Sequence, residues 1–372
     1  MMKPLYKDLI YLLACAVNDI APDPEKVRRI DLDALYPLLK RHSLRAMIHP
    51  VLDKAGVVNK DIAEAYHKSV RKNILLDIER ESISADFEKA GIWYLPLKGS
   101  LLKDLYPSAG MREMVDNDIL IDGSLREKAH EIMLSRGYST RRYLRGSCDE
   151  YDKPPVMNFE LHADLFDKTH YPTLQRRYED MMKLTVSDGK SRFGRKFSDE
   201  EFYLYMTAHE FKHFQTGGTG IRSLADCYIF VKKRKLNWEY IRKNAAAMGM
   251  EPFERQRLIL AKKLFSKIPP HPLSQQESRL LDAYLEYGIY GTYSRLAENR
   301  MERFFKRSGS RSKAAFILKQ FISNAEHLER WYPFLKKAPY LLPVAYIMRL
   351  HKSLTADRVR TFSQLKGIIR YK

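Results

Sequence analysis

The sequence has few cysteines and no apolar run long enough to cross a membrane. Its 372 residues include only Cys15, Cys148 and Cys227, which form no CxxC pair. We therefore expect no disulfide framework, and a reducing, cytoplasmic setting is the default. The stretch APYLLPVAYIM (338–348) contains two prolines and is far shorter than the ~20 apolar residues of a transmembrane helix. No transmembrane segment is expected, although a peripheral membrane contact stays open.

A second apolar stretch, LIYLLACAV (residues 9–17), lies near the N-terminus. It resembles the core of a short signal peptide, with Cys15 as a lipoprotein acceptor. However, Asp8 precedes the stretch, Leu13 fits poorly just upstream of such a cysteine, and the run is short for this purpose. We therefore expect a buried first helix.

Acidic residues are fewer than basic residues in this chain. There are 65 Lys and Arg residues against 46 Asp and Glu, for a net charge of +19. This excess favours polyanionic partners, namely nucleic acid, nucleoside triphosphates or an acidic membrane face, without choosing among them. A hydrophobic content of 45% and a charged content of 30% are typical of a globular protein.

Strand-like segments are confined to the middle of the sequence. Helical periodicity dominates residues 1–90 and 196–372, and the strand-rich core occupies residues 91–195. The expected strands are IWYLPL (92–97), MVDNDILID (114–122) and NFELHADLF (158–166), in a β-α-β-α-β pattern. We therefore predict an α+β fold, in which a small mixed β-sheet core is flanked by N-terminal and C-terminal helical regions.

The second of these strands contains two carboxylates. On a strand, Asp116 and Asp118 project from the same face about 7 Å apart, while Val115, Ile119 and Ile121 face the core. Two like charges this close repel each other unless a cation lies between them, and Mg²⁺ prefers oxygen ligands. Alternatively, the two aspartates belong to a turn before a strand that begins at Ile119.

A third carboxylate comes from the last strand. In NFELHADLF, Glu160 and His162 lie on the polar face, opposite Phe159 and Leu161. On a strand next to Asp116 and Asp118, Glu160 would complete a site for two Mg²⁺ ions about 3.5–4 Å apart, as in phosphoryl transfer.

The turn in LPLKGSLLKDLY lies between a strand and a helix. Gly99 and Ser100 there would present backbone N–H groups and a hydroxyl at the N-terminus of the helix, an arrangement that suits a terminal phosphate.

The order of these features resembles the polymerase-beta-like nucleotidyltransferase superfamily. It is most similar to the bacterial branch of uncharacterised nucleotidyltransferases, over about residues 30–235. The positions that carry the resemblance are Lys98-Gly99-Ser100, Tyr106-Pro107, Arg112, Asp116, Asp118, Glu160, His162, His209, His213, Gly220, Arg222 and Asp226.

The resemblance implies Mg²⁺-dependent transfer of a nucleoside monophosphate from a nucleoside triphosphate to an acceptor hydroxyl. It implies that Asp116 and Asp118 bind two Mg²⁺ ions, and that Glu160 binds the catalytic ion and helps to deprotonate the acceptor. The implied triphosphate-binding residues are Gly99 and Ser100, with Lys98 or Arg112 neutralising the charge.

Two departures from the family pattern stand out. Asn117 occupies a position that is normally apolar, and a buried amide without partners would cost about 1–3 kcal/mol. It must therefore find a hydrogen bond, or the strand must be more exposed than assumed. The spacing from Ser100 to Asp116 is also longer than is common in the superfamily.

A competing motif is HEFKH at 209–213. As H-E-x-x-H on a helix, it would place His209 and His213 on one face with Glu210 as the base of a zinc metallopeptidase. Thr216 stands where the extended signature has glycine, and no third histidine follows at the right distance. The other interpretation has both histidines packed or hydrogen-bonded beside a nucleotidyltransferase site.

Three further residues have two interpretations each. Arg222 and Asp226 form an i,i+4 ion pair, or Arg222 reaches the nucleotide phosphates. His162 either orients a metal-binding carboxylate or fills an exposed face.

The C-terminal region, with RMERFFKRSGSRSKAAFILK (300–319) and the tail from residue 349, concentrates positive charge and aromatics. This composition suits a polyanion contact, with nucleic acid or an anionic membrane, and also ordinary solvated helices. The acceptor stays open among small molecules, saccharides, proteins and RNA. A third functional class is a non-catalytic module that binds nucleotide or nucleic acid with the same fold.

Overall fold

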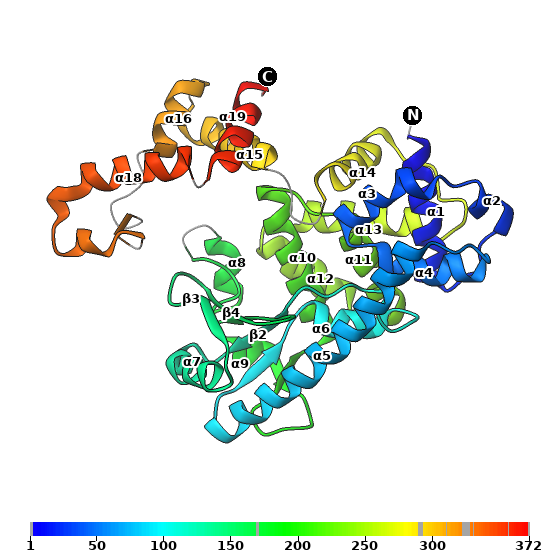
Figure 1. Ribbon diagram of the computed structural model, residues 1–372, viewed down its shortest axis with the longest axis horizontal. Coiled ribbons are helices and arrows are strands. Elements are labelled where there is room, and N and C mark those ends of the chain that lie inside the picture. Colours follow the sequence, from blue (N-terminus) through cyan, green and yellow to red (C-terminus); the bar gives the residue numbers. More distant parts are fainter. Residues whose placement is uncertain are drawn as a thin grey trace. The chain divides into compact units, whose positions relative to one another are not determined.

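The computed structural model describes residues 3–168, 171–288, 293–309, 311–321, 328–329, 331–355 and 357–370. The chain divides into two compact units (Figure 1). The N-terminal unit comprises residues 1–211 and 221–285, and the C-terminal unit comprises residues 212–220 and 286–372.

The N-terminal unit begins with helices, as the sequence predicts. They are α1 (Pro4–Asn18), α2 (Pro24–Arg28), α3 (Leu32–His42), α4 (Arg45–Lys54) and α5 (Lys60–Ala90). Residues 9–17 of α1 are all buried, as expected of a buried first helix. The long helix α5 ends at Gly91, whose φ of 71° is a left-handed conformation that glycine adopts without strain.

A five-stranded mixed sheet follows, in the order β1-β2-β5-β4-β3. Its strands are β1 (Tyr94–Pro96), β2 (Asn117–Ile121), β3 (Ser139–Arg142), β4 (Cys148–Lys153) and β5 (Met157–His162). Strand β2 pairs parallel to β5, and all other neighbours pair antiparallel. All three expected strands are present but shorter than predicted, since β5 for example ends at His162. The α+β class is confirmed.

The hairpin of β3 and β4 was not predicted. Its sequences, STRR and CDEYDK, lack the apolar alternation of a strand because charged residues fill both faces. The charges are paired within the fold: Arg126 of α7 (Arg126–Ser135) contacts both oxygens of the buried Asp149 at 2.5 Å. Such long-range pairs cannot be read from local sequence.

One face of the sheet packs on α5 and α7. Ile119 and Ile121 of β2 are fully buried there with Phe159 and Leu161 of β5, together with side chains of both helices. The expectation that Val115 also faces this core is wrong, because β2 begins only at Asn117 and Val115 is 40% exposed. Asp118 therefore lies within the strand, and Asp116 immediately precedes it.

Asn117 lies on the core face and is fully buried. Its amide nitrogen donates to the Leu76 carbonyl of α5 at 2.8 Å, and its amide oxygen accepts from Arg80 at 3.3 Å. The unusual amide between the two aspartates therefore finds the partners that burial requires.

The remaining elements of the N-terminal unit are mostly helical. They are α6 (Gly99–Leu102), the 3₁₀ turns η1 (Lys103–Leu105) and η2 (Gly123–Leu125), α8 (Pro172–Arg177), α9 (Met181–Leu184), the two-stranded sheet of β6 (Thr185–Ser187) and β7 (Arg195–Phe197), α10 (Asp199–Thr216), α11 (Arg222–Lys233), α12 (Trp238–Ala247), α13 (Glu251–Phe265) and α14 (Gln275–Tyr287). The last residues of α10 and α14 fall in the C-terminal unit. Ser198 caps the start of α10, since its hydroxyl accepts from the N–H of Glu201.

The described part of the C-terminal unit is helical as well. Its elements are α15 (Tyr293–Ser308), α16 (Lys313–Phe321), η3 (Pro333–Lys336), η4 (Pro339–Leu341), α18 (Leu342–Leu354) and α19 (Arg358–Arg370). Helices α15, α16 and α19 share a small core around Met301 and Ile368. Among the described residues of both units, no helix combines the length and the apolar character needed to cross a membrane.

Candidate active site

Two carboxylates meet on the face of the sheet opposite α5 and α7. Asp118 of β2 is the direct register partner of Glu160 in the parallel strand β5, so both side chains project from the same face. His162, two residues further along β5, lies on this face too. Ligand atoms of Asp118, Glu160 and His162 all lie within 4.8 Å of one another, and no other group of three metal-ligating side chains is found in the described parts of the chain.

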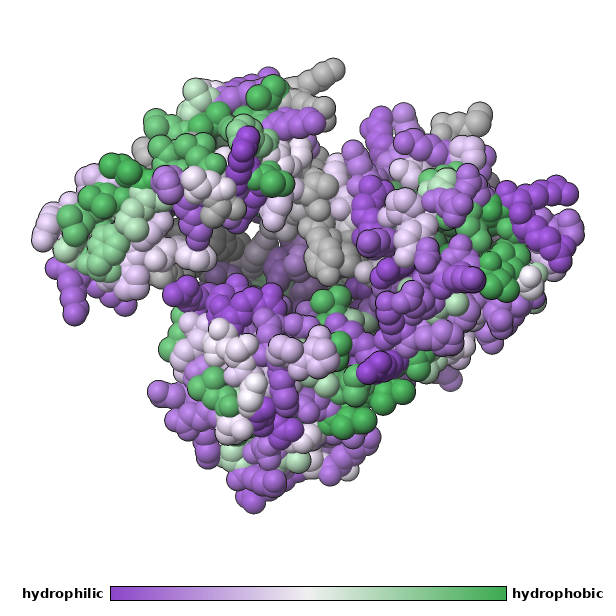
Figure 2. All heavy atoms as spheres, viewed as in Figure 1, coloured by the Kyte–Doolittle hydropathy of each residue, from purple (hydrophilic) through white to green (hydrophobic). Residues whose placement is uncertain are grey.

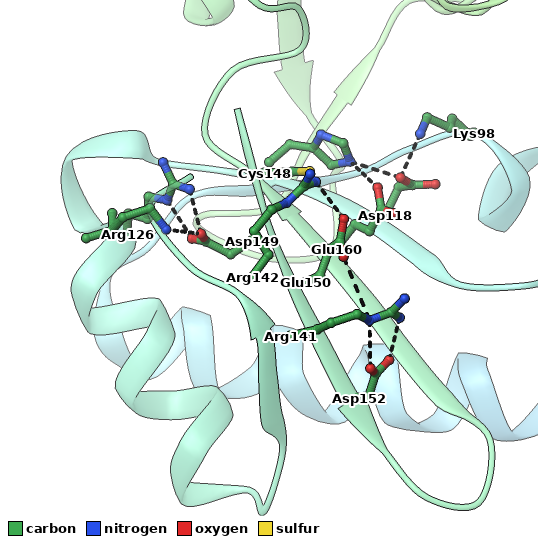
Figure 3. A network of polar contacts seen from close by, with 12 residues as sticks. Lys98, Asp118, Arg126, Arg141, Arg142, Cys148, Asp149, Glu150, Asp152 and Glu160 are labelled. Atoms are coloured by element: carbon green, nitrogen blue, oxygen red, sulfur yellow. Dashed lines mark hydrogen bonds and ion pairs between the residues drawn. The ribbon is translucent and has the colours of Figure 1, made fainter. Parts of the chain in front are cut away.

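Asp118 is held by two cationic or hydrogen-bonding partners. Lys98 Nζ lies 2.7 Å from Asp118 Oδ1, and His162 Nε2 lies 2.9 Å from the same oxygen (Figure 3). Burial alone would raise the pKa of Asp118, but the charge of Lys98 and the contact with His162 outweigh it and hold that pKa well below its usual range. Asp118 is therefore a fixed, ionised carboxylate.

The pKa values of Asp116 and Glu160 are shifted in the opposite direction. Burial, followed by the charges of Asp118 and Glu160, raises the pKa of Asp116 to about 6. Burial and the charge of Asp118 likewise raise the pKa of Glu160 above its usual value. The three carboxylates therefore repel one another, and a cation bound among them would relieve that repulsion.

The donor set fits a hard divalent cation. Asp118 and Glu160 offer carboxylate oxygens, which Mg²⁺ prefers, whereas the imidazole of His162 suits transition metals better. Asp116, a predicted ligand, is not part of this group of three. Because Lys98 and His162 both contact Oδ1 of Asp118, they fix the orientation of the carboxylate and direct Oδ2 elsewhere. His162 therefore fits a role in orienting Asp118, which is the first of the two interpretations that the sequence left open.

The turn before α6 is closely packed and strained. Lys98 has a φ of 47°, a conformation that non-glycine residues rarely adopt and that is often found at functional sites. At Gly99, an added Cβ would lie 2.4 Å from Arg112 Nη1 and 2.6 Å from Met114 Sδ, so any other residue would have to displace these side chains. The buried hydroxyl of Ser100 donates to the Leu97 carbonyl at 2.7 Å.

Arg112 lies beneath this turn and is 7% exposed. Its Nε donates to Asp226 Oδ1 at 2.8 Å and its Nη2 to Asp226 Oδ2 at 3.0 Å, while the Tyr106 hydroxyl donates to the same carboxylate at 2.8 Å. The ion pair of Asp226 is thus with Arg112, from a distant part of the sequence. Arg222 donates to the Glu113 carbonyl at 3.1 Å.

The HEFKH segment lies within α10, and its glutamate is fixed in the protein interior. Glu210 is 5% exposed, with Oε2 at 2.5 Å from Arg257 Nε and Oε1 accepting from the Tyr284 hydroxyl at 2.6 Å. A carboxylate held in this way cannot activate a water on a zinc ion. His209 and His213 both lie on α10, and neither belongs to a group of three metal-ligating side chains in the part of the chain that the structure describes. The arrangement does not favour a zinc peptidase.

Several residues near the carboxylates were missed by sequence reasoning. Glu150 of β4 is the register partner of Glu160, and Arg142 pairs with Glu150 at 2.6 Å (Figure 3). Arg141 lies 3.8 Å from the same carboxylate. The buried phenol of Tyr205 on α10 has its pKa raised by burial and also by Asp118 and Glu160. Only the charge-rich hairpin could have signalled the first three, and nothing local marks Tyr205.

The part of the chain that contains this site is similar to known proteins. Residues 28–266, more than half of the chain, match a protein family described as uncharacterised nucleotidyltransferase. The match includes all the candidate residues from Lys98 to Asp226. Among solved structures, the chain is similar to an antigenic nucleotidyltransferase-like protein from Paracoccidioides brasiliensis, with 13% identity and a TM-score of 0.35 over 59% of this chain and 93% of that one. None of the curated proteins compared with the chain matches it.

Proposed function

The chain belongs to the family of uncharacterised nucleotidyltransferases, and from this membership we propose that it transfers a nucleoside monophosphate from a nucleoside triphosphate to an acceptor hydroxyl. Pyrophosphate is the leaving group. The observation that carries the proposal is the direct pairing of Asp118 with Glu160 across two parallel strands. The proposal includes a fold of the polymerase-beta-like type, a bacterial source and a cytoplasmic setting.

In the proposed site, Asp116, Asp118 and Glu160 hold Mg²⁺, with two ions as the expected number. Bound Mg²⁺ would supply charge neutralisation at the phosphates and a lowered pKa for the acceptor hydroxyl. The acceptor oxygen attacks the α-phosphorus, and the bond from that phosphorus to the bridging oxygen of the pyrophosphate breaks. Glu160 accepts the acceptor's proton, a role that suits a carboxylate whose pKa is raised.

Lys98, Gly99 and Ser100 form the proposed triphosphate-binding turn. Lys98 holds Asp118 in place and contributes a positive charge next to the phosphates. Burial alone would lower the pKa of Lys98, but Asp118 raises it above its usual value, so the amine stays charged.

The contacts of Arg112 favour a positioning role over direct phosphate binding. Its guanidinium is buried against Asp226 and packs under Gly99, so it supports the turn from below. We propose that Arg142, which is 38% exposed beside Glu150, supplies part of the charge facing the triphosphate instead. For Arg222 the hydrogen bond to Glu113 likewise supports a structural role.

The proposal is tested by incubating the protein with each labelled nucleoside triphosphate, Mg²⁺ and a cell extract, and identifying the molecule that becomes labelled. We expect Asp116→Asn, Asp118→Asn and Glu160→Gln each to lower transfer at least about a hundredfold, because each removes charge stabilisation at the reacting phosphate. Asp152→Asn, on the outer part of β4, is the matched control and should keep transfer.

The same variants separate the functional classes. A peptidase would depend on Glu210. The proposal would be contradicted if the protein formed no labelled product and had a proteolytic activity that Glu210→Gln abolished. A non-catalytic module would bind the triphosphate and label nothing.

A further inference from the structure

Helix α18 of the C-terminal unit has an apolar face that is exposed to solvent. Val344, Ile347 and Met348 are 44%, 68% and 46% exposed, and Tyr340 and Leu354 at the two ends are 79% and 54% exposed. At about 100° per residue, Val344, Ile347, Met348 and Leu354 fall within roughly one third of the helix circumference, and Tyr340 lies in the 3₁₀ turn η4 just before the helix. We call these five residues the α18 face. Figure 2 shows apolar side chains gathered on this part of the C-terminal unit. Single exposed apolar residues are ordinary, whereas a continuous stripe marks an interaction site.

The helix is already anchored through its other side. Ala345 is fully buried with Leu328 and Leu335, and Tyr346 packs against the same small core. The α18 face is therefore a second apolar surface on a helix that has satisfied its packing. An ordinary surface helix has polar residues there.

The segment that contains the α18 face is rich in positive charge. Residues 331–355 contain Lys336, Lys337, Arg349 and Lys352 and no Asp or Glu. The first two lysines and Lys352 are exposed, and Lys352 Nζ lies 5.5 Å from the ring of Trp331, which is itself 53% exposed.

The neighbouring helix α19 repeats the pattern. Val359, Phe362 and Ile369 are 82%, 55% and 75% exposed, and Arg358 stacks over the Phe362 ring at 5.6 Å. Helices α18 and α19 are in contact. Two neighbouring helices of one unit thus carry exposed apolar residues together with basic ones.

We propose that the α18 face binds the surface of a membrane that contains anionic lipids. An aliphatic stripe bordered by lysines and by Trp and Tyr rings is the pattern of a helix that lies in the interface of a bilayer. Nucleic acid would require basic groups across the contact face itself, whereas here its centre is Val344, Ile347 and Met348. A second copy of the chain would bring the same lysines into mutual repulsion.

The test is cosedimentation of the full chain with vesicles of phosphatidylcholine mixed with phosphatidylserine, and with vesicles of phosphatidylcholine alone. We expect binding to the mixed vesicles, weakened by salt, and much weaker binding to the neutral ones. The double variant Val344→Gln/Met348→Gln should bind about tenfold more weakly, because two inserted apolar side chains are lost. Its matched control is Ile74→Gln/Ile78→Gln on α5, with exposures of 53% and 60%, which should bind as the unaltered protein does.

Charge is tested by a second matched pair. Lys336→Gln/Lys337→Gln should weaken binding to the mixed vesicles severalfold, whereas Arg242→Gln/Lys243→Gln, an exposed basic pair on α12, should not.

A measurement on the unaltered protein does not depend on whether the variants fold. Brominated lipids in the mixed vesicles should quench the fluorescence of Trp331, and the quenching should disappear in Trp331→Phe. Absence of binding to mixed vesicles, equal loss in the controls, or absence of Trp331 quenching would overturn the proposal. So would tight RNA binding, or self-association that depends on Val344 and Met348, by a protein that leaves vesicles unbound.

Discussion

The buried pair of Arg112 and Asp226 offers a quantitative test of how the phosphate-binding turn is supported. Both side chains are 8% exposed, and two hydrogen bonds of 2.8 and 3.0 Å join them. Asp226→Asn removes the negative charge with little change in shape and leaves the guanidinium buried without a counter-charge. Loss of one partner of such a pair costs about 3–5 kcal/mol. We therefore expect the free energy of unfolding of the N-terminal unit to fall by this amount.

The chain contains a close geometric match for this pair in a different environment. Arg141 and Asp152 make hydrogen bonds of 2.8 and 2.7 Å, but their side chains are 59% and 32% exposed. Because water screens this pair, Asp152→Asn should cost at most about 1 kcal/mol. An intermediate case is Tyr106→Phe, which removes one hydrogen bond to Asp226 while the ion pair stays, and should cost about 1–2 kcal/mol.

Urea unfolding followed by circular dichroism measures all three variants. We expect Asp226→Asn to destabilise the protein most, Tyr106→Phe less, and Asp152→Asn least. Equal losses for the buried and the exposed pair would refute the argument that burial gives the Arg112–Asp226 pair its importance.

Two other perturbations follow from the geometry. Gly99→Ala should lower nucleotide transfer about a hundredfold, since its Cβ would lie 2.4 Å from Arg112 Nη1. Gly123→Ala is the control and should retain activity in the same assay, because the nearest atom to its Cβ is 3.4 Å away. His42 is fully buried, and burial, followed by the charge of Arg41, lowers its pKa to about 4. As the pH falls, His42 therefore becomes protonated in the unfolded chain before it does so in the folded chain. The free energy of unfolding should therefore fall by about 2 kcal/mol as the pH drops from about 7 to about 5. Urea unfolding of His42→Gln should show a correspondingly smaller decrease over this pH range. An unchanged pH dependence in this variant would contradict the lowered pKa of His42.

The sequence predicted those features that local periodicity encodes. Alternation along β5 placed Glu160 and His162 opposite Phe159 and Leu161. A third carboxylate beside the Asp-x-Asp segment was predicted because strands in one small sheet bring their polar faces together.

Features set by distant partners could not be predicted. Strand β4 has the charged sequence CDEYDK, and its carboxylates pair with Arg126, Arg141 and Arg142, which lie outside the strand. Sequence alone could not show that Arg112 is buried, because its partner Asp226 lies 114 positions away. The start of β2 at Asn117, which leaves Val115 exposed, depends on the hydrogen bonds of Asn117 to α5.

We propose that Asp118 and Glu160, with Asp116, hold a divalent cation at the reacting phosphates. Mn²⁺ binding by the full chain in the presence of a non-hydrolysable nucleoside triphosphate, followed by electron paramagnetic resonance of the free ion, tests it most directly. We predict bound Mn²⁺ in the unaltered protein and in Asp152→Asn, and its loss in Asp118→Asn and Glu160→Gln at unchanged helical content. Equal Mn²⁺ binding by all four proteins would contradict the claim.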